Sequence, residues 1–304
     1  MRAKLQVLIA SALFGSLAAA VQLSGVAASP ASAGFARILL GGGLLGIAAI
    51  WASASARTAP PAPGSTHRRV PTWVVALIGA LGVLGYQPLY FVGTGVNGVA
   101  VGTVVALGSA PVITGVAEIV FHRRAPGVRW MVATALCIVG VAMTSGLMGA
   151  PVSLGSGGGV LWSVAAGACY ATYAVAAKEL MERGWTSRRA MGALFGVAAV
   201  ASLPLLVVVG AEWLFTPRGL ALVVWLGVFG TALGYLLFGW GLAVLPATTV
   251  TTLTLAEPLC ATLLGIGVLR ESLSLVAAIG LGVLALGLTL ITIQRSRGDV
   301  AATT

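Results

Sequence analysis

Hydrophobic residues form long runs along the whole chain, and short polar stretches separate these runs. Each run holds about 20 residues, the length that an α-helix needs to cross a hydrocarbon core of roughly 30 Å. The runs and their breaks predict ten membrane-spanning helices, at residues 4–24, 33–53, 72–93, 98–120, 127–147, 158–178, 189–210, 218–242, 247–269 and 273–294. We therefore expect an all-α polytopic membrane protein, with the lipid bilayer as its surroundings.

The composition agrees with this pattern. Of the 304 residues, 59% are hydrophobic and 8% are charged, whereas soluble domains carry about 25% charged residues. The formal net charge of +10 could indicate nucleic-acid binding. However, the basic residues stand singly or in twos and threes between apolar runs, without interleaved aromatic residues, so no nucleic-acid partner is predicted.

The N-terminus is similar to a secretory signal. "MRAKLQVLIASALFG" combines a basic start with an apolar stretch, and "ASPASAG" offers a cleavage-like site after Ala33. The apolar run continues through Leu23, which is long for a signal core, and it has a counterpart later in the chain. We therefore interpret it as the first spanning helix.

Lysine and arginine residues fall unevenly on the two sides of the expected membrane. If the ten spans alternate in direction, Arg218 and Arg270 lie on one side and Arg37 lies within a span. The other fourteen basic residues lie on the side of the N-terminus: Arg2, Lys4, Arg57, Arg68, Arg69, Arg123, Arg124, Arg129, Lys178, Arg183, Arg188, Arg189, Arg295 and Arg297. Because cytoplasmic loops carry an excess of Lys and Arg, both termini are expected in the cytoplasm, at the plasma (inner) membrane.

The two halves of the chain resemble each other. "SALFGSLAAA" aligns with "GACYATYAVA", and "GVAVGTVVALGSAPVITGVAEIVFHRRAPG" aligns without a gap with "LPATTVTTLTLAEPLCATLLGIGVLRESLS", which places Pro111 opposite Pro258. Each half has five spans, so the second half enters the membrane from the opposite side. We expect two inverted five-helix repeats, at residues 1–150 and 151–304, an architecture typical of transporters.

Four segments carry a resemblance to a known family: "SALFGS", "GFARILLGGGLL", "YFVGTGVNGVAVGTVVALGSAPV" and, above all, "LAEPLCATLLGIGVLRESLS". With them the chain resembles the drug/metabolite transporter superfamily, specifically the EamA-type ten-helix exporters, over essentially its whole length. It departs from the family pattern at "FHRRAP", where members commonly carry a glutamate after the fourth span; Glu271 in "VLRES" keeps one in the second half. The resemblance implies small-molecule efflux and leaves the substrate open.

Glu257 and Pro258 interrupt the apolar stretch "TTLTLAEPLCATLLGIGVL". Glu257 lies about ten residues into its span, roughly 15 Å deep. A carboxylate at that depth is expected to face a cavity or a partner, where it could bind an amine or exchange a proton; a structural hydrogen-bond anchor is the alternative. Pro258 is expected to free the carbonyl of Thr254, and Pro111 to interrupt the matching helix, as at transporter binding sites. A simple packing kink is the equal alternative.

Arg37 is expected in the first turn of the second span, where it could bind a substrate carboxylate, pair with Glu257, or extend to the interface. Aromatic and amide side chains are the other candidates. They are Tyr86, Gln87 and Tyr90 in span three, Tyr170 and Tyr173 in span six with Trp162 above them, and Tyr235 and Trp240 in span eight. A lipid-facing aromatic belt is the alternative for each, although Tyr86 and Tyr170 lie deeper than a belt would.

Other polar residues suggest no chemistry. Glu118, one turn from "HRR", is interpreted as an interfacial ion pair. Cys137, Cys169 and Cys260 match no metal or redox spacing, and the two histidines lie in different loops without acidic neighbours, so no metal, cofactor or catalytic set is predicted. The sequence favours a secondary transporter that exports a small polar or amphipathic metabolite by alternating access. A membrane scaffold and, less so, a membrane-embedded enzyme are the alternatives.

Overall fold

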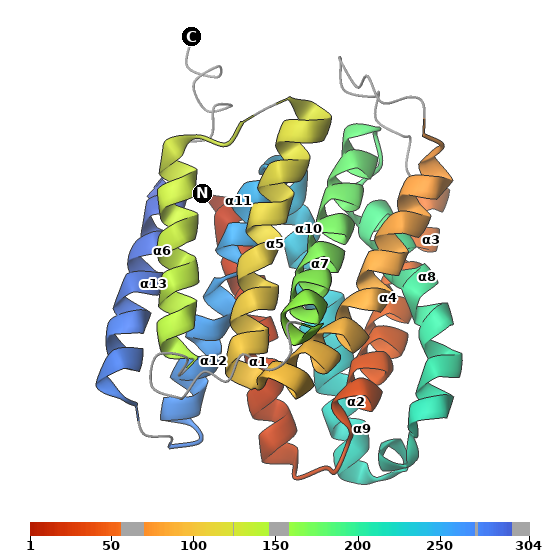
Figure 1. Ribbon diagram of the computed structural model, residues 1–304. Helices are drawn as coiled ribbons and strands as arrows, with labels where there is room; N and C mark the ends of the chain where they lie inside the picture. The colour runs from red at the N-terminus through yellow and green to blue at the C-terminus, as the bar shows by residue number, and fades with distance from the viewer. Residues whose placement is uncertain (56–69, 124, 146–157, 271–272, 294–304) are drawn as a thin grey trace.

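The computed structural model describes residues 1–55, 70–123, 125–145, 158–270 and 273–293. Within these ranges the regular elements are all helices, and they stand side by side in one bundle (Figure 1). In the described part of the chain, nine stretches are long and apolar enough to cross a membrane, and a tenth, Val128–Thr144, is shorter. The prediction of an all-α polytopic membrane protein is therefore confirmed.

The ten predicted spans all correspond to helices in the described part of the chain. Seven are single helices: α1 (Arg2–Ser24), α4 (Thr72–Asn97), α5 (Val99–His122), α6 (Val128–Thr144), α7 (Gly158–Glu182), α8 (Ser187–Val209) and α13 (Leu275–Ile293). Three are divided: α2 (Pro30–Arg37), η1 (Ile38–Gly42) and α3 (Gly43–Ser55) form span two; α9 (Pro217–Val224), η3 (Trp225–Leu233) and α10 (Gly234–Val244) form span eight; α11 (Ala247–Leu253) and α12 (Ala256–Gly267) form span nine. A short 3₁₀-helix, η2 (Glu212–Phe215), precedes α9.

The N-terminal helix is an integral part of the bundle. Val7, Ala10 and Ser11 of α1 are fully buried, and the helix packs against α10 and α12. Gly15 lets it approach α12 closely, because a Cβ there would lie 2.6 Å from the carbonyl oxygen of Glu257. The Ala33 site of the signal-like segment is buried inside α2.

Contacts between the two halves follow a two-fold pattern. Span one (α1) packs against span eight (α10), and span three (α4) packs against span six (α7); exchanging the halves converts one pair into the other. α3 with α8, α5 with α11, and α6 with α13 pair spans that are equivalent in the two halves. α1 begins and α13 ends at one face, the face of the termini, whereas α7 begins at the opposite face (Figure 1). The halves therefore run in opposite directions, as an inverted repeat requires.

Spans two and eight touch through their π-helical segments, η1 and η3. A Cβ at Gly41 would lie 2.2 Å from the carbonyl oxygen of Gly227, so this approach requires glycine. π-Helical turns are rare and are frequent at functional sites. Arg37 immediately precedes η1, and Tyr235 lies two residues after η3.

The two prolines differ from the prediction. α5 is one continuous helix with Pro111 inside it, so the expected interruption there is wrong. Span nine is divided, but the break at Thr254–Leu255 precedes Pro258, which lies in the first turn of α12. A proline is tolerated in a first turn, where its missing N–H has no helical partner. Nor is the Thr254 carbonyl freed, because the Glu257 N–H donates to it at 2.9 Å.

Candidate functional site

The five tyrosines of the chain gather in one cluster in the middle of the bundle. Ring centroids are 5.8 Å apart for Tyr86–Tyr90, 6.2 Å for Tyr86–Tyr170, 5.0 Å for Tyr170–Tyr173 and 5.9 Å for Tyr173–Tyr235. They come from α4, α7 and α10, so both halves contribute. Tyr170, Tyr173 and Tyr235 are buried, while Tyr86 and Tyr90 are half-buried, which makes these two the accessible edge of the cluster.

Arg37 lies deeper than the sequence indicated. Its span begins at Pro30, so Arg37 is about two turns, or roughly 10 Å, from the helix start. The oxygen of the Gln87 amide accepts hydrogen bonds from Arg37 Nε at 2.8 Å and from Nη2 at 2.6 Å. Arg37 also hydrogen-bonds the Tyr235 side chain. Since Gln87 is only 6% exposed, the guanidinium is held by a buried partner from α4 and another from α10.

Glu257 lies near the middle of span nine, in the first turn of α12. Its side chain is half-buried, and it interacts electrostatically with Arg37, Tyr86 and Tyr90. Among the described residues, its carboxylate has no ion pair and accepts no hydrogen bond. A carboxylate near the middle of a membrane protein is costly without a partner. Glu257 is thus the polar group of the site that remains available to a bound molecule.

The break in span nine fixes the position of Glu257. Thr254, the first residue of the break, exchanges a side-chain hydrogen bond with Tyr170. The N–H of Leu255 donates to the Thr252 carbonyl at 3.1 Å, and the N–H of Glu257 donates to the Thr254 carbonyl at 2.9 Å. Each donor lies three residues after its acceptor, whereas in an α-helix it would lie four residues after it. This tighter turn ties the start of α12 to the tyrosine cluster, because Thr254 bonds to Tyr170. The Tyr170 ring in turn contacts both Tyr86 and Tyr173.

Not every candidate joins this cluster. Trp162 has 46% of its surface exposed near the start of α7, and the structure does not bring it to the tyrosines within the described residues. Trp240 is half-buried in α10, one and a half turns beyond Tyr235. Tyr90 stacks on Tyr86 and exchanges a hydrogen bond of 2.7 Å with Thr103, which joins α4 to α5 at the edge of the site.

Sequence reasoning missed the phenylalanines that surround the tyrosines. Phe14 lies 4.9 Å from Tyr235, Phe195 lies 4.1 Å from the same ring, and Phe238 lies 5.8 Å from it. Phe14 belongs to "SALFGS", but an apolar side chain in an apolar helix carries no signal for its direction. The nearby groove of about 400 Å³ between α3, α8 and α9 is lined only by apolar residues, such as Leu40, Leu206 and Val223, so it offers nothing to a polar substrate.

Comparisons with known proteins agree with this architecture. The model of the EamA-like transporter family matches residues 1–146 and again residues 157–293. The "Uncharacterized transporter YwfM" of Bacillus subtilis (strain 168) is 33% identical over 287 residues, which cover 94% of this chain and 92% of that protein. A solved crystal structure with 21% identity has the same fold, with a TM-score of 0.77 over 96% of this chain and 98% of that one. With two matches to one family model that leave only a short connection and the C-terminal end uncovered, the chain belongs to the EamA-like transporter family.

Proposed function

We propose that this transporter is a secondary exporter of a small polar or amphipathic metabolite, such as an amino acid, and that it works by alternating access across the plasma membrane. Membership of the EamA-like transporter family makes the protein a transporter of the drug/metabolite type. The substrate, the direction of transport and the energy source are the proposed part.

One observation carries the proposal: two opposite charges and all five tyrosines meet between the two halves, near the middle of the spans. Arg37 comes from span two, Glu257 from span nine and the rings from spans three, six and eight. In inverted-repeat transporters the substrate binds at the repeat interface near the midplane. Burying charged side chains inside a membrane protein costs free energy, and a role in substrate binding explains why the chain keeps them there.

The arrangement assigns a role to each side chain. Arg37, whose guanidinium is held by Gln87 and Tyr235, is a fixed anchor for a carboxylate. Glu257, which has a free carboxylate among the described residues, binds an amine or takes up and releases a proton during the cycle. Tyr86 and Tyr90 offer ring faces and hydroxyls to an apolar or cationic part of the substrate. Together they fit a zwitterion with an apolar portion.

Reconstitution into proteoliposomes tests the proposal. Uptake or counterflow of radiolabelled amino acids, nucleobases and common drugs is measured with and without an imposed pH gradient. We expect saturable transport of a zwitterionic substrate that a pH gradient accelerates, and an Arg37→Gln, Glu257→Gln double variant that inserts normally but transports at the rate of empty liposomes. Full transport by the double variant would overturn the assigned site, because neither charge would then be needed.

A further inference from the structure

We propose that α11 is a gate at the face of the molecule that carries the termini, and that Glu118 is the latch that holds it closed. This inference rests on the proposed alternating access, which requires one face of the bundle to open while the other stays closed. It concerns Thr248, about two and a half turns before Glu257, and Glu118 of α5.

Glu118 joins the first half of the chain to the start of α11 in the second half. Its Oε1 accepts a hydrogen bond from the Thr248 N–H at 3.1 Å, and its Oε2 accepts one from the Thr248 hydroxyl at 3.2 Å. The first N–H groups of a helix have no partner within it, and an anion at that end is favourable. The ion pair of Glu118 with "HRR" stays a prediction, because residue 124 of that segment lies outside the described residues.

Side-chain hydrogen bonds hold the rest of α11 in place. Trp130 Nε1 donates to the Thr248 carbonyl at 3.1 Å, and the hydroxyls of Thr134 and Thr252 lie 3.0 Å apart. On the other side, the Ser11 hydroxyl donates to the Leu253 carbonyl at 3.4 Å. Water can replace hydrogen bonds of this kind when a pathway hydrates, whereas it cannot replace apolar packing. Val250 and Leu253 of α11 are also fully buried in the hydrophobic core, so opening must expose these apolar side chains as well as exchange the hydrogen bonds.

The break at Thr254–Leu255 provides the joint on which α11 can move. α12 packs mainly against α1 beyond this joint, while α11 packs mainly against α5 and also contacts α1 and α13. Because the helical hydrogen-bond ladder is already interrupted there, a change of angle between α11 and α12 breaks few main-chain bonds. Movement of α11 would also shift Thr254 against Tyr170 and so reach the site.

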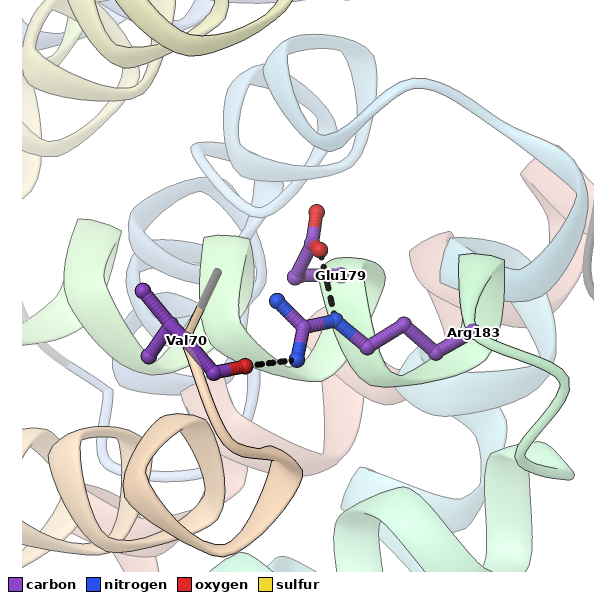
Figure 2. A network of polar contacts seen from close by, with 3 residues as sticks. All are labelled: Val70, Glu179 and Arg183. Carbon is purple, nitrogen blue, oxygen red and sulfur yellow. Dashed lines mark hydrogen bonds and ion pairs between the residues drawn. The ribbon is translucent and has the colours of Figure 1, made fainter. Parts of the chain in front are cut away.

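Other contacts tie the same face together without touching α11. Arg183 at the end of α7 donates from Nη1 to the Val70 carbonyl at 2.7 Å, and its Nε lies 2.7 Å from Glu179 Oε1 (Figure 2). The Val70 contact, like the Glu118 contact, links the two halves, but it is exposed to solvent. Removing it therefore provides a matched control for removal of the latch.

The first test needs no substrate and so stands apart from the proposed function. In a background with Cys137→Ala, Cys169→Ala and Cys260→Ala, Thr251→Cys places a thiol at a fully buried position one turn below Thr248. A membrane-impermeant thiol reagent is applied from the face of the termini. We expect Glu118→Gln and, independently, Thr248→Val to raise the labelling rate at least tenfold, and Arg183→Gln to leave it within twofold. Increases no larger than that of Arg183→Gln would overturn the latch.

The second test locks the gate during transport. In the same cysteine-free background, Glu118→Cys and Thr248→Cys are joined by a short bifunctional methanethiosulfonate reagent. We expect the cross-link to reduce transport at least tenfold and a reductant to restore it. Glu179→Cys with Arg183→Cys, one turn apart at the end of α7 on the same face, is the control pair whose cross-link joins no second element and leaves transport unchanged. Full transport by the cross-linked gate pair would show that α11 does not move, even if the substrate site is correct.

Discussion

Arg37 and Glu257 carry opposite charges in the same cluster, but their surroundings differ. The Arg37 guanidinium is fixed by Gln87 and by Tyr235, whereas the Glu257 carboxylate has no hydrogen-bond partner within the described part of the chain. A preorganised cation binds an anion at little cost in ordering, because its geometry is already set. A carboxylate without fixed partners can bind different groups in turn. At the scale of residues, Arg37 is therefore the anchor and Glu257 the variable group.

Glu257→Gln keeps the size of the side chain and removes its charge and its exchangeable proton. A hydrogen bond to a charged group contributes about 1.5–3 kcal/mol, so we expect transport of an amine-bearing substrate to fall roughly 10- to 100-fold. The stimulation by a pH gradient should disappear as well. Initial rates in proteoliposomes with and without the gradient measure both effects. A variant with undiminished rate and pH stimulation would remove Glu257 from the mechanism.

Arg37→Lys keeps the charge but loses the planar fork that Gln87 and Tyr235 hold. We expect the apparent KM for a carboxylate substrate to rise roughly tenfold, which corresponds to about 1.4 kcal/mol. Gln87→Glu should raise it at least as much, because the new carboxylate would compete with the substrate for Arg37. Equal KM values in the wild type and both variants would show that Arg37 does not contact the substrate.

At this scale the sequence identified the polar residues of the site. It predicted the depth of some of them, but not the direction in which each side chain points. Tyr86 and Tyr170 were predicted in the interior from their distance to the helix ends, and the structure brings them together. Arg37 was placed too close to the surface, because the capping residue Ser29 and Pro30 start the helix earlier than the apolar run does. The direction of the Trp162 side chain could not be predicted, because a helix that is apolar all round has only a weak periodic pattern.

At the scale of elements, the break in span nine decides how Glu257 is presented. With Pro258→Ala, residue 258 gains an N–H that can compete with the Glu257 N–H for the Thr254 carbonyl and so favour an α-helical turn at the break. We expect α11 and α12 to straighten into one helix and transport to fall roughly tenfold, without loss of thermal stability in detergent. Pro111→Ala is the matched control: α5 is already continuous, so transport should stay within twofold. Equal effects of the two substitutions would contradict this role of the break.

The contact between α1 and α12 depends on Gly15. In Gly15→Ala the new methyl group would lie 2.6 Å from the Glu257 carbonyl oxygen and 2.9 Å from the Ala261 nitrogen, both main-chain atoms that cannot turn aside. Overpacking of this kind typically costs about 1–3 kcal/mol. We expect a lower midpoint of thermal unfolding in detergent, measured by fluorescence-detected size exclusion. Gly282→Ala, which meets nothing within 4 Å, should not lower the midpoint.

The sequence predicts an element where the length of an apolar run determines it. It does not predict an element that depends on a contact with another span. All ten spans follow from apolar runs, because a membrane enforces a minimum helix length. The π-helical segments do not, since they depend on Gly41 meeting Gly227 from another span. The position of Pro111 alone predicted a helix break that α5 does not have, because a helix can continue through one proline when neighbouring helices pack against it.

At the scale of the whole molecule, the orientation of the bundle remains a prediction from charge. α1 begins and α13 ends on one face (Figure 1). That face receives fourteen of the 17 Lys and Arg residues, if the spans alternate. Because positively charged loops resist translocation, we expect this face in the cytoplasm. The gate formed by α11 would then open inward, since it lies at the same face.

Two single cysteines on opposite faces test this orientation. Ala27→Cys lies in the exposed connection between α1 and α2, and Thr186→Cys lies in the exposed connection between α7 and α8, on the face of the termini. In the cysteine-free background, an impermeant maleimide added to intact cells should label Ala27→Cys and spare Thr186→Cys until the membrane is permeabilised. The reverse pattern would place the termini outside and make α11 the outward gate. Labelling of both in intact cells would mean that the chain inserts in two orientations, which a bias of fourteen to two should prevent.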